Sequence, residues 1–180
     1  MEKATRRVLG AVIAGGRSRR FGSDKALALL HGRPLIEHAA EALAGQADAV
    51  VICGREYAPY PRLEDRPAAD MGPLGGLNAA LHHAAAGGFA GVLATGCDMP
   101  VFPAELAAAL IGDEPAIVAG QYLMGYWPAS LARALEAHLR EGTDRSVRGW
   151  LAVARPREVA GPALPNINTP EDLERLEQEG

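Results

Sequence analysis

With 180 residues and 48% hydrophobic residues, the chain is long enough to bury the core of a single domain spanning residues 1–180. The net charge of −4 gives no electrostatic case for a nucleic-acid partner, and no apolar run approaches the roughly 18 residues of a membrane span. The two cysteines predict no disulfide framework, and residues 1–7 read as a short basic, disordered tail without a signal-peptide core, so we expect a cytoplasmic protein that binds no membrane.

The first predicted element is a strand over residues 8–14, VLGAVIA, which is apolar on both faces and so belongs in the middle of a sheet. Gly15 and Gly16 follow it, and without a Cβ they let the backbone turn sharply and bring N–H groups close to a ligand. Four basic residues surround the turn: Arg17, Arg19, Arg20 and Lys25. The loop suits a triphosphate, and a basic surface loop is the alternative.

Two common phosphate motifs do not fit this loop. The interval from Gly16 to Gly22 is one residue too long for a P-loop, and the glycines do not form G-x-G-x-x-G. The run IAGGRSRRFGSDKAL, from Ile13 to Leu27, instead resembles the signature loop of nucleotidylyltransferases, and within them most of all that of the molybdenum cofactor guanylyltransferases.

That resemblance implies a Mg²⁺-dependent enzyme that transfers GMP from GTP to molybdopterin. It implies an α/β fold, a Rossmann-like doubly wound and mostly parallel sheet with helices on both faces. It also implies transient contact with proteins of cofactor biosynthesis or molybdoenzyme maturation. The residues that it places at the nucleotide in this loop are Ile13, Ala14, Gly15, Gly16, Arg19 and Lys25, the last two on the phosphates.

A helix from Pro34 to about Gln46 and a strand over residues 49–53 come next, and they complete a βαβ unit. Ligands in such sheets bind beyond the carboxyl ends of the strands. Cys53 stands at such an end, where the family often has an Asn near the base or ribose. The alternative for Cys53 is a small buried residue.

The segment from Asp70 to Leu77, DMGPLGGL, predicts a tight loop that leads into an Ala-rich helix over residues 77–86. It resembles the family's Asp-x-x-x-Gly-Pro-Leu-Gly-Gly motif. The resemblance implies that Asp70 contacts the nucleotide and that glycines such as Gly75 let guanine lie against the backbone. A tight loop with a helix cap is the structural alternative.

A strand is predicted over residues 89–95, and Asp98 follows it, at the carboxyl ends of the strands where ligands bind. A carboxylate together with phosphate oxygens is the usual way to hold Mg²⁺, and burying Asp98 without a cation would cost several kcal/mol. The family carries its metal-binding Asp here, so the resemblance implies that Asp98 is the metal ligand. It also implies three catalytic residues: Asp98, Lys25 and Arg19.

The second substrate is assigned to the later part of the chain. After a helix over residues 104–110 and a strand over 116–119, residues 120–128 resemble the family segment that lines this site. A helix from Pro128 to about Arg140 follows. Arg145 and Arg148 are three apart, which predicts one basic helical face suited to the phosphate of molybdopterin, with a solvated face as the alternative.

At the C-terminus we expect a strand over residues 164–167 and then a helix with Thr169 as its N-cap. Asn166 and Asn168 alternate, which predicts that both point to one side of the strand. The Asn-x-Asn-Thr-Pro block resembles the family's, whose Asn reaches the active site.

Three other functions stay open from the sequence. A molybdopterin cytidylyltransferase would share the loop and Asp98, and another small-molecule nucleotidylyltransferase would act on a sugar phosphate or an isoprenoid precursor. A carrier of nucleotide or cofactor would bind GTP without releasing pyrophosphate.

Overall fold

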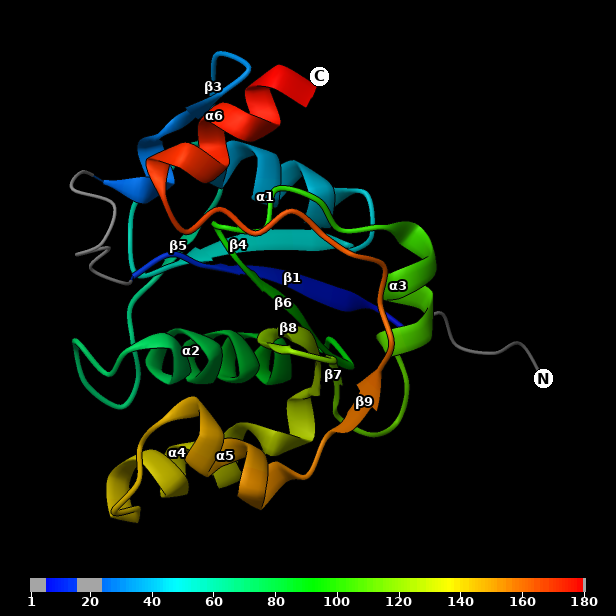
Figure 1. The fold of residues 1–180 in the computed structure, drawn as a ribbon. Helices are drawn as coiled ribbons and strands as arrows, with labels where there is room; N and C mark the ends of the chain where they lie inside the picture. Colours follow the sequence, from blue (N-terminus) through cyan, green and yellow to red (C-terminus); the bar gives the residue numbers. More distant parts are fainter. Residues whose placement is uncertain (1–5, 16–23, 180) are drawn as a thin grey trace.

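The computed structural model describes residues 6–15 and 24–179 (Figure 1). Their strands are β1 (Val8–Ile13), β2 (Leu29–Leu30), β3 (Arg33–Pro34), β4 (Ala49–Cys53), β5 (Arg62–Leu63), β6 (Gly91–Gly96), β7 (Ala116–Val118), β8 (Gln121–Pro128) and β9 (Arg157–Val159). The helices are α1 (Leu35–Ala44), α2 (Pro73–Ala86), α3 (Ala104–Leu110), α4 (Ala132–Glu141), α5 (Val147–Ala154) and α6 (Pro170–Glu179). Two short 3₁₀ turns, η1 (Lys25–Leu27) and η2 (Ala129–Leu131), complete the set.

The main sheet has the strand order β5-β4-β1-β6-β8-β7-β9. Its strands β5, β4, β1 and β6 run parallel, and β8 is antiparallel to both β6 and β7. β9 pairs parallel with β7. Only β8 therefore reverses direction, which gives the mostly parallel α/β sheet that the sequence predicts.

Helices cover both faces of this sheet (Figure 1), because its strands are apolar on both sides. Val8 and Val12 of β1 pack into a cluster with α1 and α3. Leu9, Ala11 and Ile13 face the other way, into a cluster with α2, α4 and α5. The period-2 alternation of a strand thus divides one apolar run between two cores.

Three expected elements differ from the structure. The helix predicted from Leu77 begins at Pro73, since proline fits the first helical turn and the preceding Gly72 supplies a φ of +69°. Residues 164–167 form no strand, because Pro162 and Pro165 lack the N–H that a ladder needs. The helix expected from Pro128 is divided into η2 and α4.

The expected disordered tail, residues 1–7, does not include Arg7. The Arg7 guanidinium lies 4.3 Å from the centre of the Phe89 ring, and the N–H of Ala90 donates to the Arg7 carbonyl. Residues 1–5 lie outside the described residues. Within the described ranges, none of the helices combines the length and apolar character of a membrane span.

Candidate functional site

Three parallel strands end level with one another and set the position of the site. Ile13 at the end of β1 is in register with Cys53 of β4 and with Gly96 of β6. The residues that follow these strands therefore meet at one edge of the sheet. Two of the segments touch at Gly54, whose φ is +88° and where an added Cβ would lie 2.5 Å from the Cα of Gly15.

Lys25 lies at the centre of this edge. Its Nζ is 3.6 Å from Oδ2 of Asp98 and 3.5 Å from Oδ1 of Asn168. The Lys25 side chain is 11% exposed, so most of its length is held by the protein, and Lys25 and Asp98 line the same cavity. The N–H of Ile167 donates to the Asp98 carbonyl (3.0 Å), which fastens the C-terminal segment over this pair.

Asp24 shapes the turn that carries Lys25. Its carboxylate accepts a hydrogen bond from the N–H of Ala26 (3.3 Å) and so caps η1. Arg55, which follows β4, donates to both oxygens of the same carboxylate, one of them at 2.8 Å. The hydrogen bond from Arg55 holds the pKa of Asp24 below its ordinary value.

Two cavities share Gly96, Asp98 and Leu123 as lining residues. One, of about 170 Å³, lies against the end of β1 and is also lined by Lys25. The other, of about 290 Å³, is lined by residues 120–124 and Val147. Asp98 thus stands on the wall of both cavities.

Larger hollows of about 520 and 540 Å³ lie elsewhere, against α6 and against residues 56–60. Neither is lined by Lys25 or Asp98. We therefore assign the site to the two smaller cavities, where the charged groups converge.

The residues expected at the nucleotide are only partly brought together. Ile13, Ala14 and Gly15 line or border the smaller cavity. Cys53 is fully buried beneath α2, where burial raises the pKa of its thiol to about 12. Gly16 and Arg19 lie outside the described residues.

Asp70 and Gly75 do not lie together in one loop, as the sequence predicts they do. Asp70 is exposed in the turn before α2, with a φ of +57°. Gly75 is not in a loop but in the first turn of α2, where an added Cβ would lie 3.0 Å from Oδ2 of Asp65. Of the tight loop expected within residues 70–77, the part from Pro73 onward is therefore helix.

Asp65 is a carboxylate that the sequence reading missed. Its side chain packs beside the start of α2, and desolvation raises its pKa while the N–H of Met71 opposes that shift. No local pattern separates Asp65 from the other acidic residues before Gly72, such as Glu64 and Asp70, so the sequence offered no signal for it.

The residues expected at the second substrate are dispersed. Ser146 caps α5 by accepting from the N–H of Gly149 (3.0 Å), so Arg145 precedes the helix and only Arg148 is on it. The expectation of one basic helical face is therefore wrong. Both arginines are exposed, and Val147 between them lines the larger of the two cavities.

The two asparagines do not share a side of a strand. Oδ1 of Asn168 contacts Lys25, whereas Oδ1 of Asn166 is buried with no hydrogen-bond partner among the described residues. Thr169 does cap α6, since its Oγ1 accepts from the N–H of Asp172 (3.2 Å) and the Asp172 carboxylate accepts from the N–H of Thr169 (3.0 Å).

Comparison with known proteins identifies the family. The family model of the MobA-like NTP transferase domain matches residues 10–159. The chain belongs to this family. The guanylyltransferase resemblance of the signature loop is thereby confirmed, and this MobA-like chain is a nucleotidyltransferase.

Curated relatives of this MobA-like chain match over nearly its whole length. A molybdenum cofactor guanylyltransferase of Acidiphilium cryptum is 37% identical over 92% of each chain. One of Rhodobacter capsulatus is 35% identical over 95% of each. Among solved structures, molybdopterin-guanine dinucleotide biosynthesis protein A of Archaeoglobus fulgidus has a TM-score of 0.72 and 26% identity, over 95% of this chain and 97% of that one.

The carboxylates of this MobA-like domain fit a metal ion that is held partly by the protein and partly by the substrate. The described residues contain no group of three or more His, Cys, Asp or Glu side chains that could hold an ion. Two carboxylates, Asp24 and Asp98, line the cavity at the end of β1, and that of Asp24 accepts hydrogen bonds from Arg55. Asp98 has a third of its side chain exposed. Mg²⁺ commonly binds through one or two carboxylates and completes its shell with substrate phosphates and water. The site therefore fits a magnesium ion that binds together with a nucleotide.

Proposed function

We propose that this chain transfers GMP from GTP to molybdopterin, forming molybdopterin-guanine dinucleotide and releasing pyrophosphate. The observation that carries the proposal is the place of Asp98 on the wall of two cavities, with the Lys25 ammonium 3.6 Å from its carboxylate. The guanylyltransferase names of relatives covering 92–95% of the chain support the choice of base and acceptor.

The reaction needs no enzyme nucleophile. The phosphate of molybdopterin attacks the α-phosphorus of GTP in line, the α–β phosphoanhydride bond breaks, and pyrophosphate leaves with the bonding electron pair. Burial raises the pKa of the Cys97 thiol to about 11, so this cysteine stays protonated at neutral pH and is a poor nucleophile. Rate then comes from positioning the two substrates and neutralising charge.

One group of site residues binds the nucleotide and another binds molybdopterin. The nucleotide occupies the cavity at the end of β1, where Lys25 donates hydrogen bonds to its phosphate oxygens and Gly15 approaches the ligand closely. Asp98 would hold Mg²⁺, which when bound offsets negative charge on the phosphates. Arg19 and Gly16 are assigned to the phosphates, and Asp70 and Gly75 to the guanosine, on resemblance alone.

Molybdopterin occupies the cavity lined by residues 120–124 and Val147. Arg148, which follows Val147 on α5, is the first candidate for its phosphate, with Arg145 as the second. Asn168 reaches the site through Lys25. Asn166 lines the hollow against α6 and is assigned to the same substrate on resemblance alone. We place the reaction in the cytoplasm, in transient contact with proteins of cofactor biosynthesis or molybdoenzyme maturation; the two free cysteines fit such a reducing compartment.

The test is pyrophosphate release from GTP and from CTP, each with Mg²⁺ and molybdopterin. Wild type is compared with Asp98→Asn, which keeps the side-chain shape and removes the charge. Asp113→Asn, on an exposed aspartate, is the matched control. We expect release with GTP only, a loss of about 100-fold or more in Asp98→Asn, and wild-type rates in the control.

Other outcomes select other functions. Release with CTP in place of GTP would assign the chain to cytidylyl transfer. Release that needs a sugar phosphate or isoprenoid precursor would change the acceptor. Binding of GTP without turnover under any of these conditions would favour a carrier of nucleotide or cofactor.

A further inference from the structure

The pair formed by Arg55 and Asp24 joins two segments at the edge of the site. Asp24 directly precedes Lys25, and Arg55 follows the end of β4, 31 residues later. Both Nη atoms of the guanidinium donate to the carboxylate, each to a different oxygen. Such a two-point contact fixes orientation as well as distance, which a single ammonium–carboxylate contact does not.

On one side of this pair, Asp24 controls the direction of Lys25. The Asp24 carboxylate caps the one-turn helix η1 through the N–H of Ala26, whose side chain is buried in the core. Lys25 therefore lies between the capping residue, Asp24, and the buried Ala26. From that position its side chain reaches Asp98 and Asn168. A rotation of this turn would carry Lys25 away from both partners.

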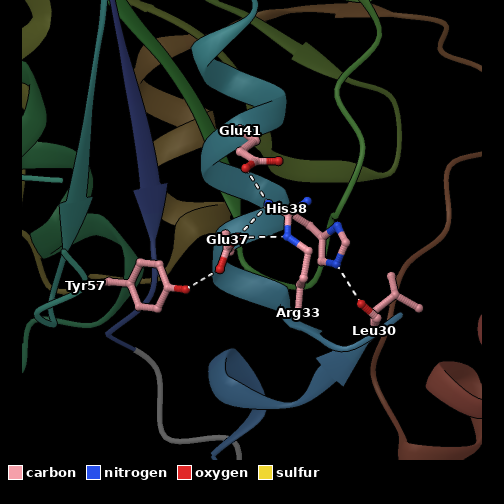
Figure 2. Close-up of polar contacts among 6 residues, drawn as sticks. All are labelled: Leu30, Arg33, Glu37, His38, Glu41 and Tyr57. Carbon is pink, nitrogen blue, oxygen red and sulfur yellow. Dashed lines mark hydrogen bonds and ion pairs between the residues drawn. The ribbon is translucent and has the colours of Figure 1, made fainter. Parts of the chain in front are cut away.

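On the other side, the segment that carries Arg55 is itself held at two points. Gly54 lies against the backbone of Gly15, as the 2.5 Å approach of an added Cβ shows. Two residues beyond Arg55, the hydroxyl of Tyr57 donates to Oε2 of Glu37 on α1 (2.7 Å), as Figure 2 shows. Glu37 is in turn held by Arg33 (2.8 Å). Arg55 is thus a firm support for Asp24.

The pair contributes little to overall stability. The Asp24 side chain is 44% exposed and that of Arg55 is 25% exposed. Ion pairs this close to solvent typically contribute only a small fraction of a domain's free energy of unfolding. The main effect of the pair is therefore to fix the orientation of the η1 turn.

We propose that Arg55 is a positioning residue that acts through Asp24 to hold Lys25 at the phosphates of the nucleotide. The effect on turnover rests on the proposed function; the effect on Lys25 itself does not. Arg55 itself does not contact the substrate.

The test is a double-mutant cycle with Arg55→Ala, Asp24→Asn and the two together. We expect kcat for pyrophosphate release to fall about 10-fold in Arg55→Ala, with a Tm shift under about 3 °C. The double variant should be no slower than the slower single variant, because both changes remove the same support. Arg55→Lys should recover only part of the rate. Arg62→Ala, which removes the exposed Arg62–Glu64 pair, is the control and should keep wild-type kcat.

A second readout does not depend on turnover. The rate at which an amine-acylating reagent modifies Lys25, followed by mass spectrometry, should rise severalfold in Arg55→Ala and stay unchanged in Arg62→Ala. Unchanged Lys25 acylation in Arg55→Ala would overturn the inference, even if the wild type proved inactive on GTP. Effects of Arg55→Ala and Asp24→Asn on kcat that multiply would also overturn it, since Arg55 would then act independently of Asp24.

Discussion

The side-chain oxygen of Asn168 lies 3.5 Å from the ammonium of Lys25, although the two residues are 143 positions apart in the chain. The contact joins the segment before α6 to η1. It gives the Lys25 ammonium a neutral acceptor beside the charged one, Asp98. The position of this ammonium is therefore set by a residue after β6 and by one before α6.

Replacing Asn168 should slow turnover without unfolding the protein. In Asn168→Ala the Lys25 ammonium keeps Asp98 but loses its second contact, and we expect kcat for pyrophosphate release to fall by about 10-fold. The Tm should change by less than about 3 °C, because Asn168 is exposed. Gln178→Ala, an exposed polar truncation on α6, is the control; equal kcat in the two variants would contradict the prediction.

Gly54 should tolerate no side chain, for two separate reasons. Its φ of +88° costs an L-residue about 1–2 kcal/mol, and an added Cβ would also collide with the backbone of Gly15. Gly120 has a similar φ of +78° but nothing within 4 Å of an added Cβ. We expect urea unfolding to show a clearly larger loss of stability for Gly54→Ala than for Gly120→Ala. Equal losses would mean that the backbone contact with Gly15 is not tight.

The two cysteines should differ in reactivity towards a thiol-alkylating reagent. Burial raises the pKa of Cys97 to about 11 and that of Cys53 to about 12, so both react slowly near neutral pH. Cys97 lines the cavity at the end of β1, whereas Cys53 is fully buried. Mass spectrometry should find Cys97 alkylated first, and added GTP with Mg²⁺ should slow its modification severalfold. Faster reaction of Cys53 in the native protein would contradict this order.

Tyr57 should ionise late in an alkaline titration. The hydrogen bond to Glu37 raises its pKa to about 12 from an ordinary value near 10 (Figure 2). A folded-state pKa above the unfolded value means that the stabilising contribution is present below about pH 10 and is lost as the pH rises through about 12. The tyrosinate absorbance of wild type minus Tyr57→Phe measures this group. It should appear at lower pH in Glu37→Gln; an ordinary Tyr57 titration in the wild type would show that the hydrogen bond is absent in solution.

Local patterns in the sequence were enough to predict several strands, one helix cap and the place of Asp98. The apolar run of residues 8–14 predicts a central strand, because burial on both faces leaves no polar position in it. The Thr169 cap and the strand over residues 49–53 follow from neighbouring residues in the same way. Asp98 could be placed at the cleft because a residue just beyond a parallel strand has to lie at that edge of the sheet.

Only the tertiary structure decided which side chains meet there. The contacts of Arg55 with Asp24 and of Asn168 with Lys25 join residues 31 and 143 positions apart, and the packing of Asp65 against α2 depends on where an edge strand ends. The early start of α2 and the irregular path of residues 164–167 also differ from the sequence prediction. Periodicity and capping report what a residue does within its own element. The pairing of charged groups between elements depends instead on strand order and register, which arise only when the whole sheet is assembled.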